Sequence, residues 1–216
     1  MNTLFETLEK HADPEKAKQM SAYMKNQFPF LGIQTPKRRE LCKPFWAERR
    51  QEKEVDWTFV EGCWAKAERE FQYVALDYLS KKKRYLKPEH IPRLKQLALT
   101  KSWWDSIDCL DRLIGDIGLT CTEVDKLMLE WSTDENFWLR RIAIDHQLNR
   151  KDKTNTALLR EILINNLNQE EFFINKAIGW SLRSYSKIDP DWVRLFIAEN
   201  REGLSALSIR EGSKYL

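Results

Sequence analysis

Histidine, glycine, proline and cysteine are all scarce in this chain of 216 residues, and each scarcity excludes a class of protein. The three histidines, His11, His90 and His146, stand apart, so neither a zinc site nor a Ser-His-Asp triad has its parts at a usable spacing. Seven glycines and seven prolines are too few for an all-β fold or a disordered chain. No glycine-rich phosphate loop occurs.

The four cysteines, Cys42, Cys63, Cys109 and Cys121, lie far apart without a C-x-x-C pair. This spacing fits reduced thiols that pack as small hydrophobic residues in a cytosolic protein. No apolar run is long enough to cross a membrane, and the charged N-terminus does not resemble a signal peptide. We therefore expect a soluble, cytoplasmic protein.

Tryptophan and charged residues, in contrast, are abundant: there are 9 tryptophans, and 32% of all residues are charged. The net charge is only +3, so any binding of nucleic acid must come from local basic clusters. Such clusters recur, for example PKRR at 36–39 and KKKR at 81–84. Any single cluster is also typical of a solvated helix end, but the recurrence of such clusters along the chain points more strongly to nucleic-acid binding than any one of them.

Apolar residues recur three and four positions apart, which predicts helices nearly throughout. When the chain is shifted on itself by 34 residues, four similar segments align: EFQYVALDYL, WDSIDCLDRL, WLRRIAIDHQ and FFINKAIGWS, beginning at Glu70, Trp104, Trp138 and Phe172. Two helices and two turns fit this period. We expect an all-α fold, an α-solenoid of stacked antiparallel helix pairs (HEAT-like repeats) with a concave basic face.

We expect one domain over residues 1–216, with the repeats in residues 67–216. Residues 1–66 are less regular, with helices expected near 2–11, 14–27, 35–50 and 54–66. Asp13-Pro14 and Thr35-Pro36 mark two of these starts, because a capping side chain precedes a proline at the first helical position.

Asp108 breaks the repeat pattern. The residue before the small residue of each repeat is Val74, Asp108, Ile142 and Lys176 in turn. A carboxylate at a position that is aliphatic in two repeats costs stability unless it is paired or solvated, and such departures often mark functional sites. The alternative is a structural ion pair with Arg141 or another base of the neighbouring repeat.

Trp104 lies four residues before Asp108 and therefore on the same helix face. Stacked repeats would bring Arg141, Trp180 and Arg183 next to this face. Indoles attract cations, a carboxylate stabilises developing positive charge, and arginines bind phosphates. This combination fits a nucleoside whose N-glycosidic bond is breaking. An alkylated purine is already cationic and leaves without protonation, so one carboxylate would suffice.

The neighbouring acids are assigned more ordinary roles. We expect Asp105 and Asp111 on the helix surface, and Asp145 as an i,i+4 partner that holds Arg141 in place. Six tryptophans are expected to pack in the core, and Trp103 is expected to point inward; the six are Trp46, Trp57, Trp64, Trp131, Trp138 and Trp192.

Five segments carry a resemblance to a known family: YMKNQFPFLGIQTPKRR at 23–39, EREFQYVALDYL at 68–79, TKSWWDSID at 100–108, FWLRRIAI at 137–144 and EFFINKAIGWSLRSY at 171–185. In these segments the chain resembles the HEAT-like repeat alkylpurine DNA glycosylases, the AlkD family of bacterial DNA alkylation repair enzymes. The matches follow one another in the same order and cover nearly the whole chain.

This resemblance implies a monofunctional enzyme that hydrolyses the N-glycosidic bond of positively charged N3- and N7-alkylpurines in duplex DNA, without metal or cofactor. It implies that Asp108 is the catalytic carboxylate, that Trp104 and Trp180 flank it at the deoxyribose, and that Arg141 assists near the lesion phosphate. The residues expected to contact DNA are Tyr23, Gln34, Thr35, Arg38, Arg39, Lys176 and Arg183.

The expected partner is double-stranded DNA containing alkylated bases, bound by a monomer without an obligate protein partner or a membrane. The expected location is the bacterial cytosol, in association with the nucleoid.

Three departures from the family bear on this expectation. The first helix is a few residues shorter, Pro44 falls within the third expected helix, and the chain stops soon after Arg210. Sister groups with reduced N-terminal helices lack glycosylase activity. The alternative function is therefore a non-catalytic, DNA-binding HEAT-like paralogue that recognises damaged or branched DNA. A tetratricopeptide scaffold shares the period but not the signature residues.

Overall fold

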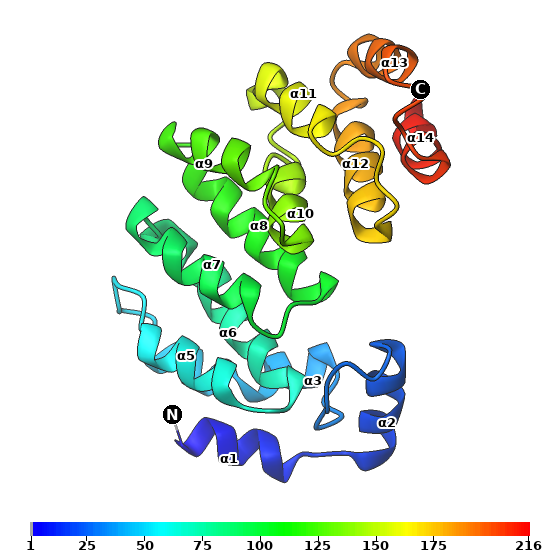
Figure 1. Ribbon diagram of the computed structural model, residues 1–216. Coiled ribbons are helices and arrows are strands. Elements are labelled where there is room, and N and C mark those ends of the chain that lie inside the picture. Colours follow the sequence, from blue (N-terminus) through cyan, green and yellow to red (C-terminus); the bar gives the residue numbers. More distant parts are fainter. Residues whose placement is uncertain (1) are drawn as a thin grey trace. The chain divides into compact units, whose positions relative to one another are not determined.

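The computed structural model describes residues 2–216 and is entirely helical. Within these residues there are fourteen α-helices, four short 3₁₀ helices and no strand, which confirms the expected all-α fold (Figure 1). The chain divides into two compact units, which we call unit 1, up to Leu86, and unit 2, from Lys87 to Leu216. Every helix in the described part is too short or too polar to span a membrane.

Unit 1 contains six α-helices and one 3₁₀ helix: α1 (Asn2–Lys10), α2 (Pro14–Tyr23), α3 (Thr35–Leu41), α4 (Lys43–Glu48), α5 (Trp57–Ala65), α6 (Arg69–Lys81) and η1 (Lys83–Tyr85). Two expected helices were wrong in extent. The helix expected over 35–50 is two helices that meet at Cys42, because Pro44 begins a new helix instead of continuing the old one. The helix expected over 14–27 ends at Tyr23, since Lys25 and Asn26 adopt positive φ.

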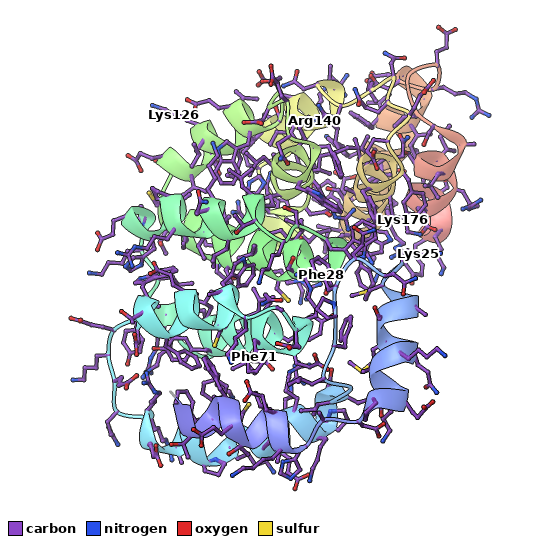
Figure 2. All side chains as sticks on the ribbon, turned by 60° about the horizontal axis from the view of Figure 1, so that its bottom comes forward. Lys25, Phe28, Phe71, Lys126, Arg140 and Lys176 are labelled. Carbon is purple, nitrogen blue, oxygen red and sulfur yellow. The ribbon has the colours of Figure 1, made fainter. Side chains whose placement is uncertain are left out.

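The loop between α2 and α3 is fixed by the start of α6. The buried carboxylate of Glu70 accepts hydrogen bonds from the backbone N–H groups of Leu31, Gly32 and Ile33 at 2.8–3.0 Å. Gly32 has a φ of 90°, and a Cβ there would lie 2.1 Å from the carbonyl oxygen of Asp13, so no other residue fits. Figure 2 labels Phe28 in this loop and Phe71 on α6, and both belong to unit 1.

Unit 2 holds the last three of the four repeat segments, and the first, at Glu70, lies on α6 of unit 1. The elements of unit 2 are η2 (Pro88–His90), α7 (Ile91–Leu99), α8 (Trp104–Gly118), α9 (Glu123–Trp131), α10 (Phe137–Asp145), η3 (Lys151–Lys153), α11 (Thr156–Ile164), α12 (Phe172–Tyr185), α13 (Pro190–Glu199), α14 (Ala206–Gly212) and η4 (Ser213–Tyr215). Helices α8, α10, α12 and α14 pack on one another in sequence, while α9 and α11 form part of a second layer (Figure 1). This stacking confirms the repeat organisation.

Helix α14 continues the row one step beyond the four segments that the sequence revealed. It starts 34 residues after α12 and packs closely against it. Two glycines allow the approach, because a Cβ on Gly179 would lie 2.6 Å from Cβ of Glu211 and one on Gly212 would lie 3.0 Å from Cβ of Leu182. The pattern is hidden here, since Glu211 occupies the position of the recurrent small residue.

Candidate active site

The first turn of α8 is positioned by an aromatic cluster. Trp103 is extended and precedes the helix, and its indole packs edge-on against Trp138 at 6.0 Å and Phe173 at 5.3 Å between ring centroids. Its ring thus packs with residues of α10 and α12, which fits the inward orientation expected for Trp103. Because this indole anchors the start of α8, Trp104 and Asp108 follow on one face, one helical turn apart.

Asp108 forms an ion pair with Arg141 of α10. The Nε and Nη2 groups of Arg141 both donate to Oδ1 of Asp108, at 3.0 and 2.8 Å. The second oxygen, Oδ2, accepts no hydrogen bond from any described residue, and the Asp108 side chain keeps 15% of its surface exposed. Burial raises the pKa of Asp108 above the usual value for aspartate, and the charge of Arg141 opposes this rise.

Arg141 is held from several sides and is itself almost inaccessible, with 1% of its surface exposed. Its Nη1 donates to the carbonyl oxygen of Phe173 at 2.7 Å, and Nη2 lies 3.7 Å from Oδ2 of Asp145, the expected i,i+4 partner. The guanidinium also lies 5.3 Å from the ring of Trp180. Arg141 therefore links the carboxylate of α8 to the indole of α12, and its burial leaves little surface for contact with a phosphate.

Asp111, expected on the helix surface, is buried, and that expectation was wrong. Oxygens of Asp108, Asp111 and Asp145 lie within 4.8 Å of one another, and neither oxygen of Asp111 or Asp145 has a hydrogen-bond partner among the described residues. Burial raises the pKa of Asp111 well above the usual range and that of Asp145 to about 7. Such a cluster can hold a metal ion, but here the guanidinium of Arg141 already supplies a cation.

Trp180 lies among basic side chains, and two of them are already paired. The charged groups of Lys176 and Arg183 lie 5.6 and 6.0 Å from its ring centroid. The carboxylate of Glu211 accepts from Lys176 at 2.8 Å and from Arg183 at 3.0 Å. Figure 2 labels Lys176 on α12. The two expected DNA contacts therefore share one carboxylate that the sequence did not point to.

The expected DNA-contacting residues of unit 1 fall into two groups. Tyr23 is 72% exposed, and Gln34, Thr35 and Arg39 are also exposed around the start of α3. Arg38 is instead 5% exposed, because its guanidinium pairs with Asp77 at 3.2 Å and stacks on Tyr73. Direct contact of Arg38 with DNA is therefore disfavoured, and its contacts indicate a structural role.

Comparisons with known proteins agree on one family. A sequence model of a family described as "DNA alkylation repair enzyme" matches residues 4–216. A solved structure described as a predicted DNA alkylation repair enzyme from Enterococcus faecalis is 40% identical to this chain, with a TM-score of 0.87; the alignment covers 95% of this chain and 96% of that one. No curated protein matches the chain.

Proposed function

Because the chain belongs to the DNA alkylation repair enzyme family, we propose that it is a DNA glycosylase that excises cationic N3- and N7-alkylpurines from duplex DNA. Asp108 is the catalytic residue in this proposal, and Trp104 and Trp180 contact the deoxyribose of the damaged nucleotide. The surrounding DNA is bound by Lys176, Arg183, Tyr23, Gln34, Thr35 and Arg39.

The single observation that carries this proposal is the divided role of the Asp108 carboxylate. Oδ1 accepts both hydrogen bonds from Arg141, while Oδ2 has no partner within the described residues. The carboxylate is thus held in place by one oxygen and presents the other to a ligand. Because Asp108 is partly buried, its charge is screened less by water than that of a surface carboxylate.

The chemistry requires one carboxylate and one water molecule. As the bond between C1′ and the purine nitrogen breaks, its electron pair neutralises the cationic base, and positive charge develops on the sugar. Ionised Asp108 stabilises that charge electrostatically and orients a water molecule. The water oxygen bonds to C1′, and its proton passes to Asp108 or to solvent. Arg141 acts as a positioning residue for Asp108.

The test is release of N7-methylguanine and N3-methyladenine from methylated duplex DNA, measured at single turnover. Wild type should release both bases, and Asp108→Asn should reduce the rate by at least about a hundredfold while duplex binding persists. Asp116→Asn removes a carboxylate further along α8 and serves as the matched control, with release close to that of wild type.

A non-catalytic DNA-binding paralogue is the second candidate. The Asp108–Arg141 ion pair favours it, because such a pair is also a sufficient structural reason for a charged residue at this position. Absence of release by a folded wild-type protein that still binds duplex DNA would favour this candidate and overturn the glycosylase.

A further inference from the structure

Unit 1 carries a basic groove whose lining residues, apart from Arg39, have no part in the proposed function. A cavity of about 410 Å³ lies between α4, the end of α6 and η1. A second cavity of about 400 Å³ lies between α3, α4 and α6. Trp46 and Lys81 line both cavities, so the two lie side by side. We call this pair of cavities the basic groove.

The charge in the groove is strongly unbalanced. Seven basic side chains line it, against one carboxylate, that of Asp77. Two of the seven have structural roles. Arg49 pairs with Asp56 at 2.7 Å, and the buried Lys82 donates to the backbone carbonyl oxygens of Arg49 and Glu52 at 2.9 and 2.6 Å. A third, Arg39, shares Asp77 with Arg38.

The remaining four cations, Lys43, Arg50, Lys81 and Arg84, are exposed, and none has a carboxylate within ion-pairing distance in the described part of the chain. Lys81 and Arg84 belong to the KKKR segment. Like charges gathered around one groove repel one another and cost folding free energy. A polyanionic ligand would remove that repulsion.

Trp46 gives the groove a rigid aromatic surface between its two halves. Its indole stacks on Tyr78, with ring centroids 5.9 Å apart and an interplanar angle of 23°, and packs edge-on against Phe45 and Phe59. These contacts fix the ring, and the rest of it lines both cavities. At the other end of the first cavity, the guanidinium of Arg84 lies 4.6 Å from the ring centroid of Tyr85.

We propose that the basic groove binds an unpaired nucleic-acid strand, with Lys43, Arg50, Lys81 and Arg84 contacting successive phosphates and Trp46 stacking against one base. A charged channel that follows the backbone, interrupted by an aromatic ring, is the arrangement that binds single strands without reading sequence. In a duplex the base faces are stacked on one another, so phosphates alone would remain for the groove to recognise, and Trp46 would have no partner.

The test is a fluorescence-anisotropy titration of a labelled oligothymidylate of about 16 nucleotides at several salt concentrations. The triple variant Arg50→Gln/Lys81→Gln/Arg84→Gln loses three phosphate contacts, each of which contributes about 0.7 to the slope of log affinity against log salt on a single strand. The magnitude of that slope should therefore fall by about two. Trp46→Leu should weaken binding by about tenfold. Because the Trp46 ring packs against Phe45, Phe59 and Tyr78, Trp46→Leu could fail to fold. The glutamine variant changes only exposed residues and keeps the test valid in that case.

The control, Lys10→Gln/Lys126→Gln/Lys214→Gln, removes the same charge from exposed positions outside the groove and should bind like wild type. Equal slopes for the groove variant and this control would overturn the proposal. The proposal would also be overturned if the groove variant lost affinity for duplex DNA but kept its affinity for the single strand. Excision of alkylpurines is measured in parallel and should be unchanged in the groove variant, so failure of this proposal is distinguishable from failure of the glycosylase.

Discussion

Both hydrogen bonds that Arg141 donates to Asp108 go to one oxygen, Oδ1, and neither goes to Oδ2. An arginine fork more often bridges the two oxygens of a carboxylate. Here the other end of the guanidinium is committed to the carbonyl oxygen of Phe173, and Asp145 lies 3.7 Å from Nη2. The orientation of Arg141 is thus set by α10 and α12, and it determines which oxygen of Asp108 stays available.

Arg141→Lys tests this arrangement directly. Lysine keeps the charge but has no planar fork, so one ammonium group cannot reach Oδ1 of Asp108 and the carbonyl of Phe173 in the same geometry. We expect the single-turnover excision rate to fall by about tenfold or more, and the free energy of unfolding to fall by roughly 1–3 kcal/mol, because a buried acceptor loses its partner.

Arg140→Lys is the matched control, since Arg140 precedes Arg141 on α10 but donates to the backbone of Asp134 and to Gln169. Its excision rate should stay close to that of wild type. A wild-type rate in Arg141→Lys would contradict the positioning role.

Asp111→Asn should be better tolerated at high pH than at low pH. Burial raises the pKa of Asp111 in the folded protein, and Asp145, Asp108, Arg112 and Arg141 act on the same carboxyl. The folded protein therefore retains protons that the unfolded chain releases at lower pH. The stability of wild type then falls as pH rises from about 4 towards the raised pKa. Asparagine stays neutral throughout and avoids this loss.

The effect is measured by thermal unfolding at pH 5 and pH 8. In a chain of this size, a change of about 1 kcal/mol in the free energy of unfolding shifts Tm by about 2–4 °C. The Tm of Asp111→Asn relative to wild type should be higher at pH 8. Asp152→Asn, on the exposed η3 turn, should show the same difference at both pH values. A difference for Asp111→Asn that does not change with pH would argue against an excess of bound protons.

The repeat pattern explains how much of this site could be read from the sequence. The 34-residue offset located α8, α10 and α12, and it placed Asp108 and Arg141 on adjacent helices. It could not locate Asp111, because the offset aligns equivalent positions, whereas the burial of Asp111 depends on how far α8 is rotated against α10. An acid three residues after Asp108 looks like a surface residue until Asp145 is known to lie beside it.

Glu211 was missed for a different physical reason. The repeat was recognised by its small residue, and in α14 a glutamate replaces that residue. The side chain fits only because Gly179 of α12 leaves room for its Cβ. Neither residue signals the contact alone. Arg38 shows the same limit, since its neighbours Arg39 and Lys37 are exposed and only the fold of α3 on α6 buries it.

Gly115→Ala should destabilise unit 2 through the contact between α8 and α10. A Cβ at Gly115 would lie 2.0 Å from the carbonyl oxygen of His146, a backbone atom that cannot move aside without shifting the chain. We expect a loss of about 1–3 kcal/mol or more from overpacking, despite the higher helix propensity of alanine. Gly118→Ala is the control, because its Cβ would first meet the flexible end of Arg150. Equal Tm values for the two variants would contradict a rigid contact.

Glu211→Gln should strengthen the binding of duplex DNA. In the free protein the carboxylate of Glu211 accepts hydrogen bonds from Lys176 and Arg183, as a phosphate oxygen would, and the bond from Lys176 lowers the pKa of Glu211. Glutamine keeps the packing against Gly179 but removes the charge, so both cations become available to phosphates. We expect about fivefold tighter binding at low salt and a slope of log affinity against log salt that is steeper by about one to two.

The matched control for Glu211→Gln is Glu199→Gln, which breaks the exposed pair between Glu199 and Arg160, at 2.6 Å on α13 and α11. Both variants change the net charge by the same amount, and the exposed pair lost in Glu199→Gln is worth at most about 1 kcal/mol of stability. A general charge effect would tighten binding equally in both. If instead Glu211→Gln alone binds more tightly, Lys176 and Arg183 contact DNA and Glu211 competes with the phosphates. Weaker binding by Glu211→Gln would mean that Glu211 holds the two cations in their binding positions, and the proposed competition would be wrong.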